Sequence, residues 1–93
     1  MFQLTGFQRD LLYVLVKLDR PSGQDVMAQI SEERNEEVNH GRLYPNLDTL
    51  VERGLVEKGQ IDRRTNYYEL TEEGRRALEE RRQWENEHVP QEL

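Results

Sequence analysis

The sequence contains no cysteine, which excludes disulfide bonds, thiolate catalysis and zinc sites built on cysteine. Long apolar runs are missing as well. The longest spans residues 11–16, far short of the ~20 residues that a membrane-spanning helix needs. The first ten residues show no charged segment followed by an apolar one, so we expect no secretion signal and a cytoplasmic location.

The groups that enzymes use are scarce. His40 and His88 are the only histidines, and their separation matches no spacing typical of metal ligands. No glycine-rich phosphate loop is present. We therefore expect no enzymatic activity, no cofactor and no metal site.

Positive charge is also in short supply. The chain has 13 Lys and Arg against 19 Asp and Glu, a net charge of −6, and only Lys17 and Lys58 are lysines. Many carboxylates with few lysines are typical of proteins that work in concentrated salt, where repulsion between like charges is screened. A salt-adapted host is therefore a hypothesis.

With 93 residues, of which 34% are apolar, the chain has room for one domain with a small core. Association into a dimer would bury further apolar surface, and we expect it for that reason.

The apolar spacing predicts three short helices in the first half of the chain. Thr5 is a suitable N-cap for the first, which should end before Pro21. Ser22 should cap the second, with Asp25 in the place of a capping-box acid, and residues 32–37 should form the exit and turn.

The third helix is predicted from about Asn39 to Arg53, where Gly54 stops it. Because proline is tolerated only in the first turn of a helix, Pro45 raises the alternative that the regular helix begins at Leu43 or Tyr44, with residues 39–42 as a turn leading into it.

After Gly54 the periodicity changes. Residues 55–60 and 65–70 predict two strands joined by a charged turn, and Thr71 should cap a last helix that runs to about His88. The expected fold is mainly α with a small β-hairpin, in the order helix-helix-helix-hairpin-helix, which is that of a winged helix-turn-helix domain. In such domains the third helix enters the major groove of DNA.

The leucines of the third helix should face the core and leave several polar residues outside. Arg42 and Asn46 carry fork-shaped donors that suit guanine and adenine edges. Tyr44 offers a hydroxyl to a phosphate, and His40 is expected to contact phosphate or solvent. Each of these residues alone is more simply an exposed helix residue, but together they favour DNA binding.

The sequence resembles the PadR family of transcriptional regulators. Residues 40–50 (HGRLYPNLDTL) are similar to the family's recognition-helix signature of Gly, Leu-Tyr-Pro and leucines. Residues 52–57 (ERGLVE) and 67–74 (YYELTEEG) are similar to the family's two wing strands and the start of its last helix. The resemblance covers roughly residues 5–78, and the Leu-Tyr-Pro block is its specific part.

This resemblance implies a homodimer built by the C-terminal helix, with Tyr44 and its neighbours on the DNA backbone and the wing tip at the minor groove. Many family members have a longer C-terminal region that responds to a ligand. Residues 71–93 are too few for that, so a sizeable effector pocket is not expected.

The predicted turn between the strands is the second candidate DNA contact. Its two arginines stand at the hairpin end, where the narrow minor groove attracts arginine. A solvated turn is the simpler alternative, and Asp62 is expected to organise the turn or to pair with an arginine. The full set of predicted DNA-binding residues is Asn39, His40, Arg42, Tyr44, Asn46, Arg63, Arg64, Thr65 and Asn66.

The last helix carries alternating pairs of acids and bases, which are typical of a solvent-exposed helix. Trp84 does not fit that pattern. Tryptophan is enriched in interfaces, so Trp84 with Leu78 and Val89 is predicted to form the dimer contact, against the alternative that Trp84 packs on its own core.

We accordingly divide the chain into a DNA-binding domain over residues 1–70 and a dimerisation helix and tail over residues 71–93. The expected partners are a palindromic double-stranded operator and a second copy of the chain, acting most simply in repression. The alternative, favoured by the net charge of −6, is a winged helix that binds another protein and does not contact DNA.

Overall fold

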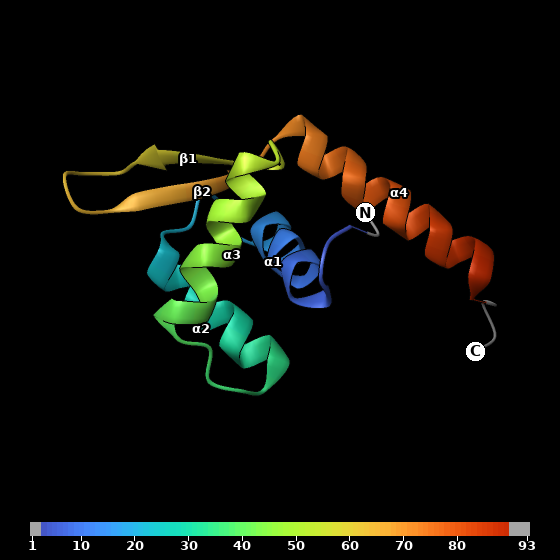
Figure 1. Cartoon of the computed structure of the whole chain (residues 1–93), viewed down its shortest axis with the longest axis horizontal. Helices are drawn as coiled ribbons and strands as arrows, with labels where there is room; N and C mark the ends of the chain where they lie inside the picture. Colours follow the sequence, from blue (N-terminus) through green and yellow to red (C-terminus); the bar gives the residue numbers. More distant parts are fainter. Residues whose placement is uncertain (1–2, 90–93) are drawn as a thin grey trace.

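The computed structural model describes residues 3–89 of the chain. Four helices and one hairpin follow in the order α1 (Gly6–Lys17), α2 (Gly23–Arg34), α3 (His40–Glu52), β1 (Val56–Gln60), β2 (Asn66–Leu70) and α4 (Glu72–His88). The predicted fold class and order are confirmed. Figure 1 shows the hairpin projecting at one end of the molecule and α4 reaching away from the three-helix body at the other. None of the described helices is long and apolar enough to cross a membrane.

The helix starts follow from their caps. The side chains of Thr5 and Ser22 accept hydrogen bonds from the third backbone N–H of α1 and α2, and each helix closes a full capping box. Asn39 and Thr71 cap α3 and α4 in the same way, by accepting from the N–H groups of Arg42 and Gly74. All four caps were predicted from the sequence.

Two helix ends differ from the prediction. α1 ends at Lys17 rather than directly before Pro21, and Arg20 adopts a positive φ of 47° in the connection. α2 continues through Arg34, and Asn35 ends it in the left-handed conformation with φ 52°. Asparagine tolerates that conformation better than most residues, so the acidic stretch turns at Asn35 and not at its beginning.

The predicted start of α3 near Asn39 is confirmed, because α3 begins at His40. The alternative that Pro45 delays the regular helix to Leu43 or Tyr44 is wrong. Proline removes one backbone donor from a helix. The missing donor leaves the carbonyl of Gly41 without its helical hydrogen bond, and because Gly41 is exposed this carbonyl can bind solvent instead.

One core lies between α1, α2, α3 and the hairpin. Its fully buried side chains include Leu11 and Leu12 of α1, Leu43 and Leu47 of α3, and Tyr68 of β2. The strands are antiparallel with Val56 opposite Leu70, and a bridge between Ser22 and Tyr67 ties the hairpin to the start of α2. This core fixes the orientation of α3 relative to the hairpin.

Candidate nucleic-acid interface

The face of α3 that points away from the core is open. Leu43, Leu47 and Leu50 are fully buried, whereas Gly41, Pro45 and Asp48 on the other side are exposed. Because successive residues of a helix are rotated by about 100°, Arg42 and Tyr44 lie on opposite flanks of this exposed face. The exposed face of α3 and its two flanks form the candidate interface.

On the first flank, α3 meets the hairpin and the start of α2 in a groove of about 370 Å³. Four of the predicted DNA-binding residues line it, Tyr44, Arg64, Thr65 and Asn66. Ser22, Gly23, Gln24 and Tyr68 complete the lining, and the sequence reasoning missed them. The structure thus brings together residues from three separate segments.

Tyr44 fits closely over the first turn of α2. A Cβ atom at position 23 would overlap the Tyr44 hydroxyl and ring, so glycine at this position provides the space that the tyrosine uses. The ring of His40 lies 5.3 Å from that of Tyr44, one helical turn earlier. Tyr68 is buried at the base of the groove, and burial raises the pKa of its hydroxyl.

The turn between the strands is held by hydrogen bonds within the turn. Asp62 Oδ1 accepts from the N–H of Arg64 at 2.9 Å, and the N–H of Ile61 donates to the carbonyl of Thr65 at 2.8 Å. The bond from Arg64 holds the pKa of the Asp62 carboxyl below its usual value. The prediction that Asp62 organises the turn is confirmed. The side chains of Arg63 and Arg64 are exposed.

On the second flank, the candidate residues bind α1. Asn46 Oδ1 accepts from Gln8 Nε2 at 3.0 Å, and the Arg42 guanidinium lies 4.2 Å from the centre of the Phe7 ring. Asn39 is occupied as the cap of α3. In the free chain the Arg42 guanidinium and the Asn46 side-chain amide therefore already have partners in α1. Contact with a base would require these two groups to leave Phe7 and Gln8.

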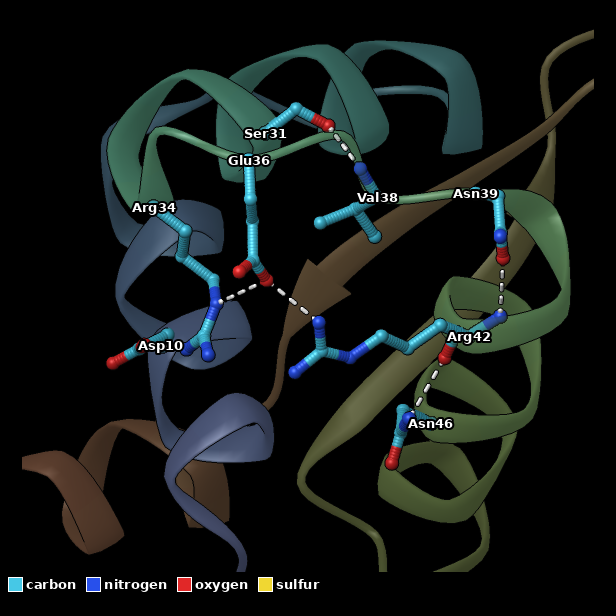
Figure 2. A network of polar contacts seen from close by, with 8 residues as sticks. All are labelled: Asp10, Ser31, Arg34, Glu36, Val38, Asn39, Arg42 and Asn46. Atoms are coloured by element: carbon cyan, nitrogen blue, oxygen red, sulfur yellow. Dashed lines mark hydrogen bonds and ion pairs between the residues drawn. The ribbon is translucent and has the colours of Figure 1, made fainter.

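Arg42 also belongs to a network at the turn between α2 and α3 (Figure 2). Arg42 Nη1 lies 2.6 Å from Glu36 Oε1, and Arg34 Nε lies 3.1 Å from the same oxygen. Asp10 Oδ2 holds the other side of Arg34 at 2.6 Å. The hydrogen bonds from Arg34 and Arg42 lower the pKa of Glu36.

The predicted dimerisation residues lie along α4 in different surroundings. Leu78 is 5% exposed and belongs to the core of this chain, whereas Val89 is exposed. Trp84 is half-buried, with the His88 ring stacked on it at 4.4 Å and the Arg81 guanidinium 4.5 Å from its centre. Residues 90–93 of the predicted tail, like residues 1–2 of the predicted DNA-binding domain, lie outside the described residues.

A second groove, of about 460 Å³, runs between α1 and α4. Its lining includes Leu78, Tyr13 and the 54% exposed Val16, together with three charged residues of α4. Burial raises the pKa of Tyr13, with a smaller contribution from Glu85. Among residues 3–89 no group of three or more His, Asp or Glu is placed to hold a metal ion.

The sequence analysis does not identify the residues that join the flanks to α3. Gln8 carries no prediction, Phe7 belongs to the predicted first helix, and Arg34 and Glu36 belong to the predicted turn over residues 32–37. Their roles depend on contacts between segments that are distant in the sequence. The capping pattern at residues 22–25 predicts the start of α2, but only the structure shows that this start lies beside the hairpin.

Comparison with known proteins supplies independent information. Residues 11–80 match the Transcriptional regulator PadR-like family. A search of curated proteins gave no match.

Solved structures match over most of the chain. RosR of H. salinarum is 49% identical, with a TM-score of 0.83 over 87% of this chain and 73% of that one. RosR in its complex RosR-S1 is 48% identical, with a TM-score of 0.85 over 89% of this chain and 73% of that one. F93 from STIV, described as a winged-helix DNA-binding protein, is 21% identical with a TM-score of 0.74 over 89% and 90% of the two chains, which shows the shared fold.

Proposed function

The chain belongs to the PadR-like family of transcriptional regulators, and we propose that it regulates transcription as a homodimer that binds a palindromic double-stranded operator, most simply as a repressor. In this proposal α3 enters the major groove and the turn between β1 and β2 approaches the adjacent minor groove. The proposed contacts are the residues predicted from the sequence. They are Asn39, His40, Arg42, Tyr44 and Asn46 at α3, and Arg63, Arg64, Thr65 and Asn66 of the hairpin.

The observation that carries this proposal is the groove that joins α3 to the hairpin. It gathers Tyr44, Arg64, Thr65 and Asn66 beside the start of α2, directly next to the exposed face of α3. A helix N-terminus, a tyrosine hydroxyl and an arginine are all groups that bind phosphate oxygens. One DNA strand passing along this flank would leave α3 facing the base edges.

Selection of bound duplexes from a random pool tests the proposal. A homodimer of this domain should enrich inverted repeats whose half-sites are separated by one helical turn of DNA or a multiple of it. Enrichment of single, unrepeated sites would contradict the dimeric geometry. A pool that shows no enrichment at any salt concentration would contradict DNA recognition itself.

A protein-binding winged helix is the second candidate, and it has a specific observation in its favour. Asp48 and Glu52 are exposed on the C-terminal half of α3, where they would repel phosphates. Under this alternative the chain would show no affinity for any duplex and would instead bind a protein partner. The duplex selection therefore separates the two candidates.

For assembly, we propose that residues 71–93 pair two copies through α4, with the groove between α1 and α4 at the edge of the contact. Trp84→Ala should then convert a dimer to a monomer in analytical sedimentation at micromolar concentration, because large aromatic side chains dominate interface energies. Ile61→Ala, which truncates an exposed apolar side chain of the hairpin, serves as the control and should leave the mass unchanged. A Trp84→Ala variant that remains dimeric would move the contact to Val16 and the groove.

A further inference from the structure

The turn between α2 and α3 presents a carboxylate to two arginines. Arg34 Nε and Arg42 Nη1 both approach Oε1 of Glu36, at 3.1 and 2.6 Å. The two guanidinium groups also share the ring of Phe7, which lies 4.2 Å from Arg42 and 5.3 Å from Arg34. Phe7 is 6% exposed and belongs to the core, so its ring is held in place against both guanidinium groups.

The backbone fixes where Glu36 stands. The N–H of Glu36 donates to the carbonyl of Ser31 at 3.1 Å, and the N–H of Val38 donates to the Ser31 hydroxyl at 3.0 Å. Asp10 binds Arg34 from the side of α1 at 2.6 Å. Arg34 therefore keeps one carboxylate partner if the Glu36 side chain rotates away, whereas Arg42 has no other ion pair among residues 3–89.

The position of Arg34 and Arg42 relative to a bound DNA duplex follows from the geometry of α3. Arg42 lies on the flank of α3 opposite Tyr44 and the hairpin groove. The major groove is bordered by a phosphate backbone on each side and is just wide enough for a helix. A helix held to one strand along the Tyr44 flank brings its other flank towards the second strand, where Arg42 and Arg34 stand together.

We propose that Arg34 and Arg42 form a clamp for a phosphate of the second DNA strand, and that the carboxylate of Glu36 occupies this clamp in the free chain. The inference rests on the proposed DNA binding and adds Arg34 and Glu36 to the interface. Two arginine forks around one anionic oxygen suit a phosphate as well as a carboxylate. On binding, the phosphate replaces Glu36 and the glutamate turns to solvent, with no covalent change.

This exchange has a consequence for an acidic protein. While Glu36 sits in the clamp, the group of Asp10, Glu36, Arg34 and Arg42 is neutral overall and offers a phosphate little attraction. Displacing Glu36 uncovers one net positive charge where the phosphate docks. Glu36 and Arg42 are both about two-fifths exposed, so their ion pair is weak enough for a phosphate to displace.

The test compares Glu36→Gln with Glu37→Gln on a fixed operator duplex, by fluorescence anisotropy across a range of KCl concentrations. Both variants remove one negative charge from the same turn, and Glu37 is exposed with no ion pair among residues 3–89. Glu36→Gln should bind about two- to fivefold more tightly than Glu37→Gln, the range expected for one exposed ion pair.

Adding Arg42→Ala to each variant completes the comparison. The advantage of Glu36→Gln over Glu37→Gln should shrink in the Arg42→Ala background, because only Arg34, which Asp10 still holds, is then left for the phosphate. Equal affinities of the two single variants would overturn the clamp, as would weaker binding by Glu36→Gln, which would mean that Glu36 orients Arg42 for binding.

The outcomes separate the two proposals. A wild-type chain that binds no duplex contradicts DNA binding itself and the clamp with it. A wild-type chain that binds with no difference between the glutamine variants contradicts the clamp alone. Thermal melting of each variant checks that the fold is retained, and Glu36→Ala provides a second substitution of the same carboxylate.

Discussion

Gly74→Ala should destabilise the chain by about 1–3 kcal/mol, although alanine is the better helix former. Gly74 lies in the first turn of α4, where an added Cβ would overlap the backbone carbonyl oxygen of Leu55 and crowd the Leu70 side chain. The carbonyl is part of the chain just before β1, and it accepts a hydrogen bond from the N–H of Thr71 at 3.1 Å. It therefore cannot move away without breaking the junction between the hairpin and α4.

Gly41→Ala is the matched control, because Gly41 is also in the first turn of a helix. The nearest atom to its added Cβ is Asn39 Oδ1 at 3.5 Å, which is an ordinary contact. Here the helix preference of alanine is unopposed, and a gain of roughly 0.5–1 kcal/mol is expected. Chemical denaturation measures both variants, and a Gly74→Ala chain as stable as Gly41→Ala would show that the packing of α4 on the hairpin is looser than described.

Replacing Arg63 and Arg64 by alanine should weaken duplex binding by on the order of tenfold for each arginine that contacts DNA. Both side chains are exposed at the end of the hairpin, in a turn whose shape is set by Asp62 and Thr65 and does not depend on the arginine side chains. The plot of log affinity against log salt concentration should also flatten by about one unit per lost phosphate contact.

The control for this double variant replaces Arg53 and Arg76 by alanine. Arg53 caps the far end of α3, and Arg76 pairs with Glu72 and Glu73 on α4, so both lie outside the proposed interface. The change in net charge is the same. Equal losses of affinity in the two double variants would mean that only total charge matters and that the hairpin makes no specific contact.

The local features of the fold could be predicted from the sequence because they depend on neighbouring residues. Thr5, Ser22, Asn39 and Thr71 are short polar residues directly before apolar periodic stretches, and each caps its helix as expected. Pro45 raised the alternative of a later start for α3, because the general cost of proline was known, whereas the exposure of Gly41, whose carbonyl loses its helical donor, was not.

The candidate site was predictable only in part, because some of its contacts join residues that are distant in the sequence. Tyr44, Arg64, Thr65 and Asn66 stand out as residue types at the right places in the order of elements. The clamp at Glu36 joins residues 10, 34, 36 and 42 across three segments, and the bond between Gln8 and Asn46 spans 38 residues. No periodicity or cap encodes such contacts, so they emerge only when α1 and α3 are packed together.

The ion pairs in the structure change the interpretation of the acidic composition. Several carboxylates are held by nearby bases, among them Glu36 by Arg34 and Arg42, and Glu69 by Arg20 at 3.2 Å. Such exposed pairs add little stability, but they reduce the charge that a phosphate meets at close range. If the chain binds DNA as proposed, we expect the affinity to come from individual contacts more than from overall electrostatic attraction.

Binding of double-stranded DNA by this acidic chain, through α3 and the hairpin, is tested by the affinity of the wild-type chain for a selected operator duplex, measured from low to high KCl. We expect binding that weakens linearly on a log–log plot, with a slope that reports several phosphate contacts. Undetectable binding at every salt concentration, or an affinity that does not change with salt, would contradict the proposed DNA binding.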